Sequence, residues 1–198
     1  MTKTLRHDLK ADSLLTKGME LLWSKGYNAT SVNDIVKAAD VPKGSFYFYF
    51  ESKEDFAVKA INKYFAVMFT PAKEILLNTS VSPKQRLLNF HEFRSNMLKN
   101  EMDCKMGCLA CNLGSEMAEH SEKIRNAILV KEQMVLALIS DVIQEAQDYG
   151  EISNVMNASD IAAFIEDALK GAMTSMKEMK SSYPIDNLMN MVRSILLK

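Results

Sequence analysis

The chain has 198 residues, of which 47% are apolar and 25% are charged, and its formal net charge is −1. This composition excludes an intrinsically disordered chain, and a charge so close to zero argues against a protein that coats nucleic acid without selectivity. The segment Met1–Lys10 is polar, and no uninterrupted apolar run exceeds the six residues of 64–69. We therefore expect no signal peptide and no membrane span. The odd number of cysteines, three, then favours reduced thiols and a cytoplasmic protein.

The first fifty residues carry the signals of three helices. Gly26 follows an apolar helical stripe and should end the first helix. Ser31 and Asp34 have the spacing of a capping box for the second helix. Asp40 lies in the turn that follows, where a residue that tolerates positive φ is needed. The predicted helices cover residues 8–25, 31–38 and 42–50.

Helical periodicity also dominates the rest of the chain, and no run alternates like a strand. Ser52 with Asp55 predicts a capping box for a fourth helix, which Pro71 should kink or end. Ser82–Pro83 predicts a cap followed by proline in the first turn. The later helices are predicted from 82 to about 100, from 107 or 108 to 119, from 121 to 149, from 157 or 159 to 180, and after Pro184 to Leu197.

The turn at 39–41 joins two short helices, which is the arrangement of a helix-turn-helix unit. In that unit the second helix enters the DNA major groove. We therefore predict an all-α protein in which a three-helix DNA-binding domain (1–52) precedes a larger six-helix domain (53–198). The expected core of the first domain consists of Trp23, Ile35, Val36, Val41, Phe46 and Phe50.

Several residues of this unit have side chains suited to DNA. Thr30 and Ser31 open the second helix, where backbone N–H groups can bind a phosphate. Gly44 would let the third helix approach the groove closely. The remaining candidates could contact phosphates or base edges through a positive charge or hydroxyl groups, or pack on a thymine methyl group. These are Lys43, Ser45, Tyr47, Phe48 and Tyr49.

The same stretch resembles the N-terminal domain of TetR-family transcriptional regulators. The matching residues are Gly26-Tyr27, Thr30-Ser31-Val32, Asp34-Ile35, Ala38-Ala39-Asp40-Val41, Lys43-Gly44-Ser45-Phe46-Tyr47, Tyr49-Phe50 and Ser52-Lys53-Glu54. Asp40 departs from the pattern, since the family usually has Gly there. The resemblance implies that Lys53 anchors a DNA phosphate, and that the last two helices pair two copies into a homodimer reading a palindromic DNA operator.

The three cysteines admit three interpretations. Cys104, Cys108 and Cys111 could be small core residues, since a spacing of four and three would place them on one helical face. That face, with His91 or His120, could hold zinc in a metal-responsive regulator, although the spacing matches no common zinc motif. A thiol at a helix start near Lys105 could instead be reactive.

The third interpretation gains from a narrower resemblance. Gly107-Cys108-Leu109, Leu113, Ser115-Glu116 and Ser121-Glu122 are similar to regulators of the N-ethylmaleimide-reductase repressor type. In those proteins a cysteine at this place responds to electrophiles and oxidants, which implies that Cys108 is a redox sensor.

The family resemblance also implies an effector pocket among the fourth to eighth helices, and the apolar candidates favour an apolar or mildly polar ligand. Besides Cys108, the candidate lining residues are Phe65, Met68, Phe90, Phe93, Met97 and Met134. No Gly-rich phosphate loop or H-E-x-x-H motif is present, and the three histidines are scattered. We therefore expect a DNA-binding repressor without a cofactor or catalytic residues, released by a small molecule or by cysteine modification.

Overall fold

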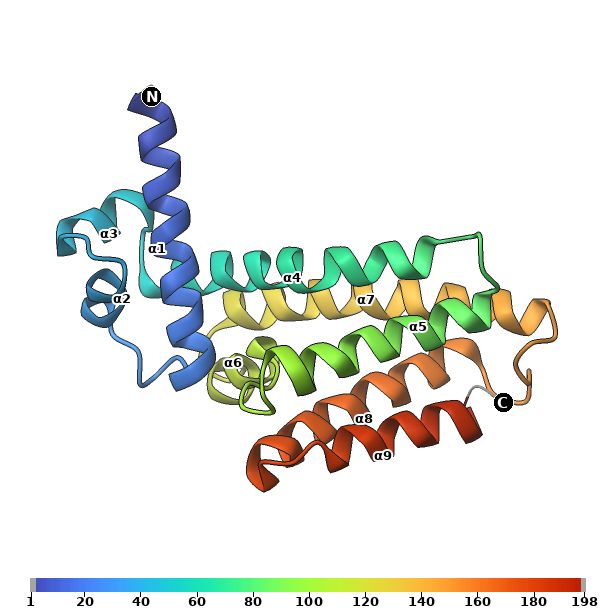
Figure 1. Ribbon diagram of the computed structural model, residues 1–198. Helices are drawn as coiled ribbons and strands as arrows, with labels where there is room; N and C mark the ends of the chain where they lie inside the picture. Colours follow the sequence, from blue (N-terminus) through green and yellow to red (C-terminus); the bar gives the residue numbers. More distant parts are fainter. Residues whose placement is uncertain (1–2, 197–198) are drawn as a thin grey trace. The chain divides into compact units, whose positions relative to one another are not determined.

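The computed structural model describes residues 3–196, and all regular structure in that range is helical (Figure 1). This confirms the predicted all-α class, with three N-terminal helices followed by six in the described range. The α-helices are α1 (Lys3–Lys25), α2 (Val32–Ala38), α3 (Lys43–Tyr49), α4 (Lys53–Leu77), α5 (Pro83–Asn96), α6 (Leu109–Met117), α7 (Glu122–Asp148), α8 (Ala158–Met179) and α9 (Tyr183–Met191). Two π-helical segments, Met97–Glu101 and Val192–Leu196, extend α5 and α9.

Most of the predicted helix ends are confirmed by their hydrogen bonds. The Ser31 hydroxyl oxygen accepts from the backbone N–H of Asp34, whose carboxylate accepts from the backbone N–H of Ser31. Gly26 adopts a φ of 87° directly after α1, and Asp40 adopts a φ of 52° in the turn. The Ser121 hydroxyl oxygen accepts from the backbone N–H of Ile124 and thereby caps α7.

The predicted effect of Pro71 is wrong in one respect, because α4 does not end there. The helix continues to Leu77. Proline removes one backbone hydrogen bond, but a helix is stabilised mainly by the packing of its apolar face. Beyond Pro71 that face is fully buried at Ala72 and Leu76. Burial therefore outweighs the missing bond.

Other helix ends also differ from the predictions. The first helix begins at Lys3 rather than Asp8. The α-helical part of the fifth helix ends at Asn96 instead of about residue 100, because the chain changes to π-helical hydrogen bonding. Pro184 lies inside the first turn of α9, where the missing N–H has no partner to lose. The predicted end at Leu197 lies outside the described residues.

Packing divides the chain into two units. The first unit combines the residues up to Ala66 with Leu109–Val130, and the second combines Val67–Cys108 with the residues from Lys131 onward. The core of the first unit contains the predicted Ile35, Phe46 and Phe50. Of the residues predicted for this core, Val41 is only half-buried, while the others are buried.

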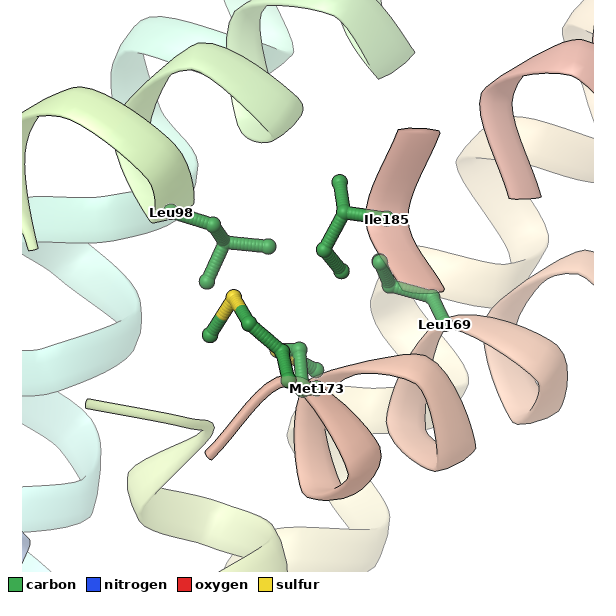
Figure 2. Packing of buried hydrophobic residues seen from close by; sticks show 5 residues of the cluster. Leu98, Leu169, Met173 and Ile185 are labelled. Atoms are coloured by element: carbon green, nitrogen blue, oxygen red, sulfur yellow. The ribbon is translucent and has the colours of Figure 1, made fainter. Parts of the chain in front are cut away.

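The second unit has an apolar cluster formed by helices far apart in the sequence. Figure 2 shows Leu98, Leu169, Met173 and Ile185 pointing toward one another. Cys104 and Cys108 are partly buried against this cluster. One core is therefore shared by the π-helical segment after α5, by helices α8 and α9, and by the loop that carries Cys104 and Cys108.

Candidate functional site

Helix α3 is held in place by one aromatic face and exposes the other. Phe46 is fully buried and Phe50 nearly so, and both rings pack on Phe56 of α4, at centroid distances of 5.5 and 4.8 Å. On the opposite face Phe48 is 71% exposed. Lys43, Gly44 and Tyr47 are exposed as well, while Ser45 and Tyr49 are half-buried. The exposed face of α3 therefore carries one positive charge and two aromatic side chains.

Gly44 has no role in the packing of the protomer. A Cβ atom built on it would meet no other atom within 4 Å. Glycine inside a helix costs about 1 kcal/mol relative to alanine. Packing within the described chain therefore does not require glycine at this position.

The backbone contact predicted for Thr30 and Ser31 with a DNA phosphate stays a prediction, but the Thr30 side chain itself points into the protein. Thr30 is fully buried, and its hydroxyl donates to the backbone carbonyl oxygen of Gly26 at 2.7 Å. Thr30 therefore stabilises the turn that precedes α2. Ser31 is exposed, but its hydroxyl is bonded to the Asp34 carboxylate at 2.6 Å, and this bond lowers the pKa of Asp34.

Lys53 lies in the first turn of α4 and is half-buried. Its Nζ atom is 4.0 Å from the centroid of the Tyr27 ring, which is a cation–π distance. Burial lowers the pKa of Lys53, while the negative charges of Glu116 and Asp34 oppose that shift. The contact with the Tyr27 ring thus holds the Lys53 ammonium group beside the helix-turn-helix unit.

The three cysteines do not share a helical face, so that prediction is wrong. Cys104 lies in a turn with a φ of 54°, Cys108 precedes α6, and only Cys111 is helical. The spacing was read as helical, but the chain leaves helical conformation between residues 102 and 108. Among the described residues, no group of three or more His, Cys, Asp or Glu side chains could hold a metal ion. The metal hypothesis therefore has no structural support.

The predicted influence of Lys105 on the Cys108 thiol stays a prediction. The Lys105 ammonium group forms an exposed ion pair with Asp103, and this carboxylate raises the pKa of Lys105. Cys108 instead lies half-buried against the apolar cluster of the second unit, just before α6. A group added to its sulfur would enter that packing.

The predicted effector-lining residues differ in burial. Phe90 is fully buried, and Arg94 lies over its ring at 5.0 Å. Four others are half-buried, namely Phe65, Met68, Phe93 and Met97. Met134 is 46% exposed on α7, so the protomer does not enclose it as a lining residue.

A buried polar cluster lies beside Phe90 and was not predicted as a site. The Arg94 guanidinium forms a two-pronged ion pair with Glu166 of α8, seventy-two positions along the chain. His91 is buried, and its Nε2 atom has no hydrogen-bond partner among the described residues. Burial, aided by Arg94, lowers the pKa of His91 to about 4. His91 and Arg94 are neighbours on α5, but only the fold brings Glu166 of α8 to them, so no local pattern could reveal the cluster.

Helix α8, which the family resemblance assigns with α9 to the dimer interface, carries an apolar stripe that mostly belongs to the core of the protomer. Five residues of α8 on this stripe are buried, namely Ile161, Ile165, Leu169, Met173 and Met176. The exposed residues of α8 and α9 include Phe164, Gly171 and Met191. The apolar periodicity of α8 therefore identifies the face that packs inside the protomer and not the face left for a second copy.

An exposed helix held by buried aromatic residues, preceded by a turn with a positive φ, defines a helix-turn-helix DNA-binding protein. Residues 14–65 match the family described as bacterial regulatory proteins, tetR family. Residues 83–192 match the Tetracyclin repressor-like, C-terminal domain. The chain belongs to the TetR family of transcriptional regulators.

Two curated relatives match nearly the whole chain. It is 32% identical over 185 residues to the HTH-type transcriptional repressor DhaR of Mycobacterium sp. (strain GP1), covering 93% of this chain and 90% of DhaR. It is 27% identical over 196 residues to the HTH-type transcriptional repressor NemR of Escherichia coli (strain K12), covering 99% of this chain and 98% of NemR. The similarity to NemR confirms the narrower resemblance read from the sequence.

Solved structures support the same assignment. The regulatory protein TetR from Rhodobacter sphaeroides superposes with a TM-score of 0.85 at 30% identity, covering 95% of this chain and 97% of that chain. The reduced form of E. coli NemR superposes with a TM-score of 0.82 at 26% identity, covering 94% and 96%. Among the described residues, none of the helices has the length and apolar character needed to cross a bilayer.

Proposed function

We propose that this TetR-family regulator is a cytoplasmic repressor that binds a palindromic operator as a homodimer. Residues 1–52 read the DNA, and residues 53–198 bind the effector and form the dimer. The exposed face of α3 carries this proposal, because Lys43, Tyr47 and Phe48 point away from the core that fixes the helix. Lys53 adds a phosphate contact beside that face.

The operator contacts are tested by removing both lysines. The operator is first selected from a random duplex library with the parent protein. The double variant Lys43→Ala/Lys53→Ala should then bind it at least tenfold more weakly at moderate salt. The slope of log affinity against log salt should fall by about two, since each lost phosphate contact contributes roughly 0.9. The control Lys73→Ala removes an exposed positive charge of α4 beyond the first unit and should bind like the parent. Unchanged affinity in the double variant would reject the assignment.

Release is proposed to follow effector binding or modification of Cys108. The thiol packs on the cluster of Leu98 and Met173, and the next residue begins α6. An adduct at this sulfur therefore changes packing at the start of that helix. The similarity to NemR supports the choice of Cys108 over the other two cysteines.

N-ethylmaleimide provides a direct test. The Cys108 sulfur adds to the carbon–carbon double bond of the maleimide, the thiol proton ends on the adjacent carbon, and nothing leaves. Alkylation should weaken operator binding of the parent and of Cys111→Ser by at least tenfold. Cys108→Ser should keep its affinity. Equal loss in all three proteins would remove Cys108 from the mechanism.

The dimer is proposed to form through the exposed faces of α8 and α9 around Phe164, Gly171 and Met191. Phe164 is 60% exposed and Met191 45% exposed, and a Cβ atom on Gly171 would meet nothing within 4 Å. Exposed apolar side chains provide surface to bury, and a glycine without a side chain lets a helix of a second copy come close.

A further inference from the structure

Glu116 of α6 binds the turn that leads into the helix-turn-helix unit. Its Oε1 atom accepts from the backbone N–H of Tyr27 at 3.0 Å, and its Oε2 atom accepts from that of Asn28 at 2.8 Å. All three residues belong to the first unit. One carboxylate thus satisfies two neighbouring backbone donors between α1 and α2, and bonds to a charged acceptor are among the stronger kind.

Gly26 makes this approach possible. It has a φ of 87°, and a Cβ atom placed on it would lie 2.0 Å from Oε1 of Glu116. Any other residue at position 26 would displace the carboxylate. Glycine is therefore needed here both as the stop of α1 and as the space for Glu116.

A second residue of α6 binds the adjacent end of α1. The Asn112 side-chain amide donates to the backbone carbonyl oxygen of Trp23 at 3.2 Å. Asn112 and Glu116 are four positions apart and so lie on one face of α6. Helix α6 thereby holds both the carbonyl end of α1 and the N–H groups of the following turn.

The residue whose backbone Glu116 fixes also places Lys53. The Tyr27 ring lies under the Lys53 ammonium at 4.0 Å, and the charge of Glu116 favours the protonated form of this lysine. A connected path runs from the α6 carboxylate through Tyr27 to the proposed phosphate contact.

We propose that Glu116 is a positioning residue for operator binding, which holds Tyr27 so that Lys53 meets the DNA backbone. This inference rests on the proposed function of Lys53. Helix α6 was predicted to lie outside the DNA-binding domain. According to this inference it supports the DNA-binding surface.

A double-mutant cycle on the full chain tests the proposal, with affinity for the selected operator measured by fluorescence anisotropy at several salt concentrations. Glu116→Ala should bind at least tenfold more weakly than the parent and lower the salt slope by about one, as Lys53→Ala does. In the Lys53→Ala background, Glu116→Ala should lower the operator affinity threefold or less. The reason is that the Lys53 contact, which Glu116 positions, is already absent. Glu116→Gln keeps one acceptor oxygen and should recover part of the affinity. Glu119→Ala removes an exposed carboxylate three positions away and should match the parent.

Two results would overturn the inference. One is an affinity of Glu116→Ala within twofold of the parent. The other is an equal loss in both backgrounds, which means that Glu116 acts on the fold alone. If Glu116→Ala fails to fold, as seen by circular dichroism, Glu116→Gln takes its place in the cycle under the same criteria. Failure of the proposed function looks different, because then neither the parent nor Glu119→Ala selects any operator.

Discussion

The ammonium group of Lys53 lies 4.0 Å from the centre of the Tyr27 ring. The two residues belong to different segments of the first unit, the turn after α1 and the first turn of α4. A lysine normally loses side-chain freedom when it binds a phosphate, and this loss opposes binding. The ring restricts Lys53 in advance, so less freedom is lost when DNA arrives.

Replacement of Tyr27 tests this arrangement. Tyr27→Leu removes the aromatic face and should weaken operator binding by about 0.5–1.5 kcal/mol, the range for immobilising one flexible side chain on binding. Tyr27→Phe keeps the face and should bind within twofold of the parent. Fluorescence anisotropy at fixed salt measures both. Equal affinities of the Leu and Phe variants would show that the ring does not matter to DNA binding.

Gly44 should show opposite effects on stability and DNA binding. Gly44→Ala places a methyl group in open space and should raise the free energy of unfolding by about 0.5–1 kcal/mol, because glycine is the poorer helix former. The same methyl group should weaken operator binding at least fivefold if α3 approaches the groove closely. Urea unfolding and anisotropy give the two values. A variant that is stabilised and still binds like the parent would place Gly44 away from the DNA.

Gly171 provides the corresponding test of the dimer. Gly171 is exposed and a Cβ atom there meets nothing within 4 Å, so Gly171→Leu should disturb the packing of the protomer little. A bulky side chain at a close helix–helix contact should nevertheless weaken dimerisation at least tenfold. Sedimentation equilibrium at micromolar concentration should show monomer, accompanied by loss of operator binding. Thr174→Leu changes an exposed residue one turn later and indicates how far the contact extends.

The sequence predicted the DNA-reading part well because its signals are local. The capping box of Ser31 and Asp34 and the positive φ of Asp40 depend on residues within a few positions, and the structure reproduces both. Thr30 shows what local signals leave open. Whether its hydroxyl faces solvent or bonds to the Gly26 carbonyl depends on packing around the turn.

The second unit was less predictable because its contacts join distant segments. The apolar stripe of α8 was visible in the sequence, but its partner was not, and the stripe packs against Leu98 and Ile185 of the same chain. The cysteine spacing suggested a helix, yet Asp103 and Cys104 both adopt positive φ. The residues around Asp103 and Cys104 in the sequence do not predict these two positive φ angles.

His91 should make the protein less stable in mild acid. Burial and then Arg94 lower its pKa from 6.5 to about 4, and Glu166 opposes this shift only in part. Between those pH values the unfolded chain binds a proton that the folded chain does not. The contribution to stability is therefore complete above pH 6.5 and is lost as the pH falls to 4, by about 3 kcal/mol in total. The depressed pKa of Glu166 adds a further loss only at lower pH, below roughly 4.3.

His91→Leu should remove this dependence. The variant also deletes a buried nitrogen that lacks a partner, so at pH 7 its free energy of unfolding should equal or exceed that of the parent. Between pH 7 and 4.5 the parent should lose about 2 kcal/mol more than the variant. Urea unfolding at the two pH values measures the difference. The control His120→Leu changes an exposed histidine and should retain the pH dependence of the parent. If His91→Leu retains it as well, His91 is not the group that titrates.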